Sequence, residues 1–334
     1  MNRVEPARAY RGVDDLWLVT TYFNPRNYET RRRNQRAFAA AFAASSLRLL
    51  TVECAFRNDA FVLPDSPDVL RVRARDLMWQ KERLLNLIIA RLPASCTKVA
   101  WLDCDVLFEN SAWAVETSRL LDEYPIVQPF DTAVRLPRGT TVDEGRSHAR
   151  QGFGAVHGLA PHAVRSGRDE AHGETGLAWA ARREVLARCG LYDACVIGGA
   201  DHAMAHAMCG DFDSGCVQLL LDNRNRHWRH FVGWGARFCD EVRGRIGFVP
   251  GAALHLWHGP HADRAYSRRH RLLEEYGFDP DTDLRIGRDG CWEWATDKPE
   301  MHRSVAEYFT QRNEDGVLHP SERPALQGLT PPRD

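Results

Sequence analysis

Long hydrophobic runs are missing from this chain, and so are the cysteine pairs that build redox motifs. No apolar stretch approaches the roughly 18 to 20 residues of a membrane-spanning helix, and residues 1–11 lack the apolar core of a signal peptide. The nine cysteines are an odd number without a Cys-x-x-Cys pair, which fits scattered reduced thiols better than a disulfide framework. These absences predict a cytoplasmic protein without a membrane span.

A strong excess of positive charge is missing as well. The formal net charge is −1, which excludes a strongly basic protein that coats nucleic acid. Local basic patches remain in the sequence. Arg71, Arg73 and Arg75 alternate, so a strand would point all three guanidinium groups to one side. Such a row is either a solvated face or a contact for phosphates.

Composition and periodicity predict an α/β protein. The 334 residues are 44% hydrophobic and 27% charged, which is enough ordinary globular material for one large domain or two small ones. In open sheets with alternating strands and helices, ligands bind outside the carboxyl ends of the strands. The apolar pattern predicts strands at 16–22, 47–53, 69–72, 98–102, 126–130 and 252–256, and helices at 30–43, 79–92, 113–123 and 203–208.

Two carboxylates, Asp103 and Asp105, close the short apolar strand predicted at 98–102. Along an extended chain, positions i and i+2 point the same way, so both carboxylates could face one cation while Cys104 turns into the body. Oxygen ligands of this kind suit Mg²⁺ or Mn²⁺, which commonly hold the diphosphate of a bound nucleotide. The alternative is a strand that ends in two solvated aspartates.

The segments around Asp103 and Asp105 resemble the corresponding segments of glycosyltransferases of the GT-A fold. Asp103-x-Asp105 matches the metal-binding motif of that family. The final segment resembles stand-alone transferases of bacteria and bacteriophages. The resemblance extends from residue 16 to about residue 312. Its segments are 18–25, 80–86, 173–180, 198–201 and 255–259, the last followed by Arg264, Tyr266 and Arg268 or Arg269.

This resemblance implies a GT-A type fold, with a Rossmann-like, mostly parallel central sheet, flanking helices and a helical C-terminal extension. It also implies a nucleotide diphosphate sugar, in the first place a UDP-sugar, as the donor. Asp103 would contact the nucleotide and also bind the metal. The other implied nucleotide contacts are Thr20, Tyr22, Glu53 and Asn86 for the base and ribose, and Lys81 or Arg83 for the phosphates.

Asp201 follows Gly198 and Gly199 and precedes a predicted helix. By this place it resembles the carboxylate that removes the acceptor proton in inverting transferases. Ala200 stands where many relatives carry an acidic residue, so the match is partial. The alternative is an aspartate that only caps the helix.

Histidines cluster at two places. His255, His258 and His261 follow the strand predicted at 252–256, and the resemblance implies that His258, or else His255, completes the metal shell. An imidazole ligand is more natural for Mn²⁺ than for Mg²⁺. The alternative is a set of surface or hydrogen-bonded core histidines. His202 and His206 could share a helical face, but His-x-x-x-His without a following Glu is weak evidence for zinc.

These observations divide the chain into four parts. Residues 1–130 form the nucleotide-sugar-binding half, and 173–260 form the acceptor and catalytic half of the same domain. Between them, 131–172 lacks periodicity, which predicts an irregular lid or a flexible loop. Residues 261–334 form a helical extension with a loose tail from 327 to 334.

The sequence therefore predicts a metal-dependent, inverting glycosyltransferase that moves a sugar from a nucleotide diphosphate sugar to a hydroxyl, with Asp201 as general base, and it leaves the acceptor open. A glycan, a protein and a hydroxymethylated pyrimidine in phage DNA all present such a hydroxyl. Two other classes stay open. A nucleotidyltransferase would release pyrophosphate and form a nucleotide sugar, and a non-catalytic protein that binds glycan or nucleic acid would bind ligand without turnover.

Overall fold

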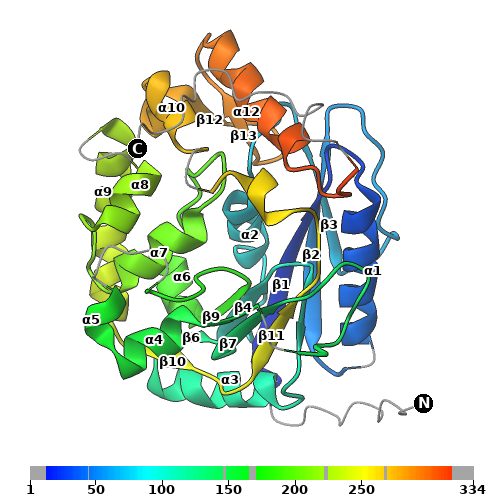
Figure 1. Ribbon diagram of the computed structural model, residues 1–334, viewed down its shortest axis with the longest axis vertical. Helices are drawn as coiled ribbons and strands as arrows, with labels where there is room; N and C mark the ends of the chain where they lie inside the picture. The colour runs from blue at the N-terminus through cyan, green and yellow to red at the C-terminus, as the bar shows by residue number, and fades with distance from the viewer. Residues whose placement is uncertain are drawn as a thin grey trace.

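The computed structural model describes most of the chain (Figure 1). Two of the predictions fall outside the described residues: Arg268 in the segment after 255–259, and the loose tail at 327–334. The described residues are 13–43, 45–145, 148–164, 171–221, 225–266 and 269–317.

Strands and helices alternate along the described chain. The strands are β1 (Leu16–Phe23), β2 (Arg48–Phe56), β3 (Val69–Ala74), β4 (Lys98–Leu102), β5 (Val106–Phe108), β6 (Ile126–Gln128), β7 (Thr132–Arg135), β8 (Ala149–Gln151), β9 (Ala178–Arg182), β10 (Ile246–Phe248), β11 (Ala252–His255), β12 (Leu284–Ile286) and β13 (Trp292–Trp294). The helices are α1 (Glu29–Ala43), α2 (Lys81–Ile89), α3 (Trp113–Glu123), α4 (Phe153–Leu159), α5 (Pro161–Val164), α6 (Arg183–Cys189), α7 (Ala200–Met208), α8 (Gly215–Leu221), α9 (Arg226–Val242), the 3₁₀ helix η1 (His261–Arg264), α10 (Arg271–Glu275), α11 (Pro280–Asp283) and α12 (Pro299–Gln311).

The central sheet has seven strands in the order β10-β6-β9-β4-β1-β2-β3. β1 pairs in parallel with β2 and β4, β2 pairs in parallel with β3, and β6 with β10. Only β9 among these strands runs antiparallel to its neighbours, β4 and β6. The predicted mostly parallel sheet with flanking helices is confirmed. The strand predicted at 98–102 and the helix predicted at 113–123 have the bounds of β4 and α3.

The two faces of this sheet carry separate cores, because successive side chains of a strand point to opposite faces. In β1, Val19 and Phe23 join a core that includes residues of α2, α6, α7 and α9. Leu18 and Tyr22 join the other core, to which α1 and α3 contribute. The sheet is thus covered by helices on both faces (Figure 1). The same alternation decides which side chains at the end of β1 reach the candidate site.

A second sheet, in the order β5-β11-β7-β8, joins segments that are far apart in the sequence. β5 begins directly after Asp105, and it pairs antiparallel with β11 so that Val106 lies opposite His255. The backbone N–H of Leu256 donates to the carbonyl of Asp105 at 2.9 Å. This pairing fixes the second carboxylate of the Asp-x-Asp motif beside the histidine segment.

The described part of 131–172 differs from the irregular chain that the sequence predicts. It forms β7, β8, α4 and α5, and β7 pairs with both β11 and β8. These elements are 3 to 7 residues long, too short for a periodic pattern to stand out. Residues 146–147 and 165–170 of this segment lie outside the described residues.

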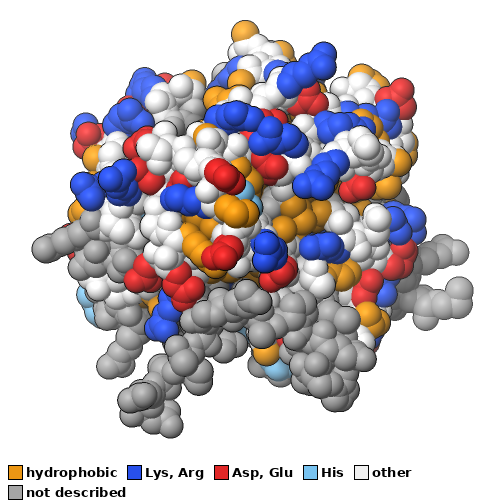
Figure 2. Space-filling model, turned by 90° about the horizontal axis from the view of Figure 1, so that it is seen from above, with side chains coloured by type: hydrophobic (Ala, Val, Ile, Leu, Met, Phe, Trp, Pro, Cys, Tyr) orange, Lys and Arg blue, Asp and Glu red, His pale blue; other side chains and the backbone are white. Residues whose placement is uncertain are grey.

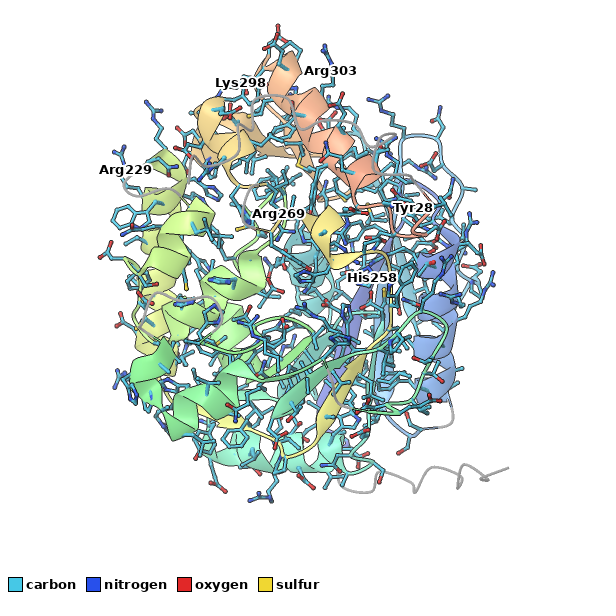
Figure 3. All side chains as sticks on the ribbon, in the orientation of Figure 1. Tyr28, Arg229, His258, Arg269, Lys298 and Arg303 are labelled. Atoms are coloured by element: carbon cyan, nitrogen blue, oxygen red, sulfur yellow. The ribbon has the colours of Figure 1, made fainter. Side chains whose placement is uncertain are left out.

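The C-terminal part is largely helical, as predicted, with the hairpin β12–β13 added. It packs back against the start of α1. The Tyr28 hydroxyl, which Figure 3 labels at this contact, donates to the Phe309 carbonyl at 2.9 Å. The backbone N–H groups of Glu29 and Thr30 donate to the Asp315 carboxylate at 3.1 and 2.8 Å. No helix among the described residues combines the length and the apolar character needed to cross a membrane.

Candidate active site

A cavity of about 510 Å³ lies where β1 and β4 end. Thr21 and Phe23 of β1 line it together with the residues 103–105 that follow β4. Its volume is in the range of small-molecule sites, about 300–1,000 Å³. In Figure 3, His258 and Arg269 of its wall lie towards the middle of the molecule, whereas Arg229, Lys298 and Arg303 lie at the periphery.

Three residues of this cavity form a compact donor group. Asp105, His255 and His258 each offer one ligand atom, and these atoms all lie within 4.8 Å of one another. The two imidazole Nε2 atoms are 2.9 Å apart. Asp105 Oδ1 is 3.8 Å from His255 Nε2, and Asp105 Oδ2 is 3.5 Å from His258 Nε2. The resemblance implies Asp105 together with His258, or else His255, as metal ligands, and the pairing of β5 with β11 brings all three residues together.

The chemistry of this group fits a divalent cation. Burial lowers the pKa of His255 to about 4 and that of His258 well below its ordinary value, and Arg264 adds to both effects. Both imidazoles are therefore neutral near pH 7, the charge state that binds metals. Arg264 Nη2 donates to His258 Nδ1 at 2.5 Å, so the His258 proton lies on Nε2 and has to leave that atom before it binds a metal. Neighbouring ligands of an octahedral cation with bonds of roughly 2.1 Å lie roughly 3 Å apart. The donor atoms of the three residues are separated by 2.9 to 3.8 Å, so the carboxylate has to move towards the imidazoles to complete such a site. Mixed nitrogen and oxygen donors suit Mn²⁺ better than Mg²⁺.

Asp103, the first carboxylate of the motif, has a different partner. Its Oδ1 lies 2.7 Å from Lys81 Nζ, and the same ammonium lies 3.8 Å from Asp201 Oδ2. Burial opposes the charge of Lys81, but Asp103 and Asp201 outweigh it and raise the pKa of Lys81. Lys81 is thus a fixed cation between the motif and Asp201. Among the described residues, the compact donor group does not include Asp103.

Asp201 lies in the first turn of α7, after two glycines with left-handed backbone angles. Gly199 is the N-cap, with φ 94°, and a Cβ there would lie 2.5 Å from Leu220 Cδ1. Asp201 is therefore not the N-cap residue. Its Oδ1 accepts a hydrogen bond from the His202 N–H at 3.0 Å, and Asp201 is part of the cavity wall. A Cβ on Gly176 would lie 2.9 Å from Asp201 Oδ2, so the lack of a side chain there leaves room for the carboxylate.

A buried charge network contacts Asp105 at the cavity wall. Arg31 Nη1 lies 3.5 Å from Asp105 Oδ2, and Arg31 Nε lies 3.4 Å from Glu314 Oε2. Arg312 Nη2 is 2.5 Å from Glu314 Oε1. Burial opposes the ionisation of Glu314, but Arg312 and Arg31 hold the pKa of its carboxyl well below the ordinary value. The network links α1 and the C-terminal segment to the donor group.

Glu82 is a cavity residue to which the sequence gives no role. Burial raises the pKa of its carboxyl to about 8, against the opposing effect of Lys81, whose Nζ lies 4.0 Å from Glu82 Oε1. Glu82 is therefore mostly protonated at neutral pH and able to donate a hydrogen bond into the cavity. In the sequence, only its position next to Lys81 points to a place in the site, because no local pattern reveals that a charged residue is buried.

The variant Glu82→Gln is expected to flatten the pH dependence of stability. The folded chain holds the Glu82 proton up to about pH 8, whereas the unfolded chain releases it near the ordinary pKa of 4.5. The free energy of unfolding therefore falls as the pH rises through this window, by at most about 1.4 kcal/mol per pH unit for one group. Urea unfolding at a series of pH values measures the slope. Equal slopes for wild type and variant would contradict the raised pKa.

The structure places Thr20 and Tyr22, the nucleotide contacts expected on β1, outside the cavity lining. The Thr20 hydroxyl donates to the Leu102 carbonyl at 2.7 Å, and Tyr22 packs in the core on the α1 face. Thr21 and Phe23 point to the opposite face and line the cavity instead. A fully buried strand has no polar face, so its sequence does not reveal which of the two alternating sets faces the ligand.

Glu53 and Asn86 also have structural partners outside the cavity lining. Glu53 Oε1 accepts from the backbone N–H of Val62 at 2.5 Å and of Leu63 at 3.1 Å. Asn86 Nδ2 donates to the Leu191 carbonyl at 2.9 Å, and Asn86 Oδ1 accepts from the Leu191 N–H at 2.8 Å. Both side chains hold loops, and neither lines the cavity. Arg83 likewise donates to the Gly290 carbonyl.

The alternating arginines of β3 and the following residue are engaged within the protein. Arg71 donates to the Leu63 carbonyl, Arg73 to the carbonyls of Arg57 and Asp59, and Arg75 to the Asp76 carboxylate. Figure 2 shows Lys and Arg side chains interspersed with Asp and Glu on the upper face, rather than gathered into one patch. The arrangement gives no support to a phosphate-backbone contact at these three arginines.

No family model matches the chain, and no curated protein matches it. Among solved structures, it is similar to glucosyl-3-phosphoglycerate synthase from Mycobacterium tuberculosis in complex with Mn²⁺, UDP-glucose and phosphoglyceric acid. That chain is 14% identical, with 85% of this chain and 88% of that chain covered and a TM-score of 0.39.

Two further neighbours are more distant in sequence. Mannosyl-3-phosphoglycerate synthase from Rubrobacter xylanophilus is 10% identical, with 83% of each chain covered and a TM-score of 0.37. S. aureus TarS, residues 1–349 in complex with UDP-GlcNAc, is 10% identical, with 90% of this chain and 72% of that chain covered and a TM-score of 0.36. The fold is instead defined by the order of the strands in the central sheet, and the candidate site by the residues that line the cavity.

Proposed function

We propose that this protein is a metal-dependent glycosyltransferase of the GT-A type. It would move a sugar from a nucleotide diphosphate sugar, in the first place a UDP-sugar, to a hydroxyl group. One observation carries the proposal: a single cavity holds the donor group Asp105, His255 and His258, the carboxylate of Asp201 and several cationic side chains. A donor with a charged leaving group and an acceptor with a proton to lose require these three kinds of group in one place.

The donor diphosphate would lie at the Asp105 side of the cavity. Asp105, His255 and His258 would hold Mn²⁺ or Mg²⁺, and the bound cation would neutralise the charge that develops on the departing diphosphate. Arg31, Arg264, Arg269 and Arg312 also line the cavity and can add hydrogen bonds to phosphate oxygens. Phe23 and Trp79, whose ring centroids are 5.2 Å apart, offer aromatic surface for the nucleotide base.

Asp201 would act as the general base. It would take the proton of the acceptor hydroxyl while the acceptor oxygen forms a bond to the anomeric carbon and the bond from that carbon to the diphosphate breaks. A single displacement of this kind inverts the anomeric centre. Lys81, 3.8 Å from Asp201 and 2.7 Å from Asp103, keeps both carboxylates in place.

The acceptor would be a hydroxyl-bearing glycan. The alternative acceptor, modified DNA, which the phage-like final segment suggests, gains no support from Arg71, Arg73 and Arg75, because their guanidinium groups have hydrogen-bond partners within the protein. Glycan binding would depend little on salt, whereas a DNA acceptor would show steep salt dependence.

The direct test is nucleotide release from a panel of UDP- and GDP-sugars, with Mn²⁺ and with EDTA. We expect slow, metal-dependent hydrolysis of one donor, with the nucleoside diphosphate as product. Pyrophosphate release on incubation with a nucleoside triphosphate and a sugar phosphate would instead identify a nucleotidyltransferase. Metal-dependent nucleotide binding without turnover of any donor would identify a non-catalytic binding protein, and both outcomes would overturn the proposal.

A further inference from the structure

A second donor group lies along α7. It shares no residue with the first, although His172, His202 and Cys216 also line the cavity. His172, His202, His206 and Cys216 each offer one ligand atom, and all four atoms lie within 4.8 Å of one another. His202 and His206 are one turn apart on α7, Cys216 is in the first turn of α8, and His172 comes from the segment before β9. Figure 1 shows α7 and α8 next to each other on the side of the sheet away from α1.

The rings are packed too closely and too deeply for ordinary surface histidines. His172, His206 and Cys216 are buried. The ring centroids of His202 and His206 are 4.8 Å apart, and that of His172 lies 4.7 Å from His202 and 5.1 Å from His206. Phe153 closes one side of the group, with ring centroids 5.9 Å from His206 and 6.2 Å from His172.

His206 is oriented by a carboxylate. Its Nδ1 lies 2.7 Å from Asp211 Oδ2, and the other oxygen of Asp211 accepts from the Ser214 N–H at 3.0 Å. Because a carboxylate accepts, Nδ1 carries the proton and Nε2 presents its lone pair. That Nε2 is buried and makes no hydrogen bond to the described residues. Histidines that bind metals commonly have this arrangement: one ring nitrogen donates to a carboxylate, and the other presents its lone pair to the metal.

The same contact places the fourth donor. Asp211 joins α7 to the start of α8 through Ser214, two residues before Cys216. In a tetrahedral zinc site with Zn–N bonds of about 2.0–2.1 Å and a Zn–S bond of about 2.3 Å, the donor atoms are about 3.3–3.6 Å apart. Because the four donor atoms all lie within 4.8 Å of one another, small side-chain movements bring them to this geometry.

We propose that His172, His202, His206 and Cys216 bind one Zn²⁺ in a closed, four-coordinate structural site. Three imidazoles and a thiolate are zinc ligands, and four protein donors leave no position for a substrate. On binding, the Cys216 thiol gives its proton to solvent and the thiolate sulfur bonds the metal. The site would fasten α7, α8 and the segment before β9 to one another, next to Asp201. This inference goes beyond the proposed function and does not depend on it.

The test uses the full-length chain and two probes, Zn²⁺ and Co²⁺. Zinc per chain is measured by elemental analysis after purification without chelator. Co²⁺ is then titrated into chelator-treated protein and followed by absorption. We expect one Zn²⁺ per chain that resists dialysis, and a Co²⁺ spectrum with a thiolate-to-metal charge-transfer band and the intense visible bands of tetrahedral coordination.

Variants assign the ligands. Cys216→Ser is expected to abolish the charge-transfer band, and Asp211→Asn to weaken Co²⁺ binding by about 10–100-fold, the usual effect of losing such a partner. Cys239→Ser, a matched change on α9, and Asp105→Asn in the other donor group are expected to leave the band unchanged.

Three outcomes would overturn the proposal. One is folded wild-type protein that retains no zinc and shows no thiolate–Co²⁺ band, which decides the question even where a variant fails to fold. Another is a band that persists in Cys216→Ser. Loss of the band in Asp105→Asn would show that both donor groups hold the same ion, and it would also contradict two separate sites.

Discussion

Replacing Asp201 with Asn is expected to lower kcat for sugar transfer by about 10²–10⁴-fold, the usual contribution of a positioned general base. The amide has the same shape but cannot take the acceptor proton at neutral pH. Binding of the donor with Mn²⁺ should be retained, because Asp201 is not part of the group formed by Asp105, His255 and His258. Steady-state kinetics with the donor found in the panel measure kcat, and calorimetry measures donor binding.

Asp240→Asn is the matched control for this variant, because it makes the same change on an exposed position of α9. It should leave kcat unchanged. Thermal unfolding of both variants shows whether the fold is kept. Wild-type turnover in Asp201→Asn would remove Asp201 from the mechanism and leave Glu174, another carboxylate of the cavity wall, as the next residue to test.

Replacing Asp105 with Asn is expected to weaken Mn²⁺ binding by about 10²-fold or more, since even the outer partners of metal ligands contribute about 10–100-fold. Asp105 is the single carboxylate in a group with two neutral imidazoles, so it supplies the only negative charge among those three ligands. Metal-dependent donor hydrolysis should fall with metal occupancy. Titration of Mn²⁺, followed by its magnetic resonance signal, measures the affinity.

Asp103→Asn is the informative comparison. The Asp-x-Asp motif predicts the same role, that of a metal ligand, for both aspartates. In the structure, however, Asp103 pairs with Lys81 at 2.7 Å and lies outside the compact donor group. We therefore expect a smaller loss of Mn²⁺ affinity from Asp103→Asn than from Asp105→Asn. Equal losses would place Asp103 among the ligands, as the motif suggests.

The sequence predicts the framework well because the framework is encoded locally. β4 is a continuous apolar run between Lys98 and Asp103, and its bounds are legible in the sequence. Asp103 and Asp105 follow the strand, so their place at its carboxyl end is legible too. The elements between 131 and 172 are not, because strands and helices of 3 to 7 residues leave no periodic signal.

The composition of the site depends on contacts that the sequence does not encode locally. Thr21 rather than Thr20 faces the cavity, which only the packing of both sheet faces decides. His255 and His258 meet Asp105 through the pairing of β11 with β5, which are far apart in the chain. His172 and Cys216 have no sequence pattern that connects them with His202 and His206, so the second donor group is visible only in three dimensions.

The contact between the C-terminal segment and the start of α1 has a consequence for the order in which the protein folds. The hydrogen bond from the Glu29 N–H to Asp315 joins residues 286 positions apart, and Arg31 bridges Glu314 and Asp105 nearby. Contacts of such long range form late, because most of the chain must be ordered before they do. A nascent chain on the ribosome can build β1, β2 and β4 long before residue 315 emerges. We therefore expect the protein to acquire its Mn²⁺ affinity late in its maturation, only after residue 315 has left the ribosome and has reached α1.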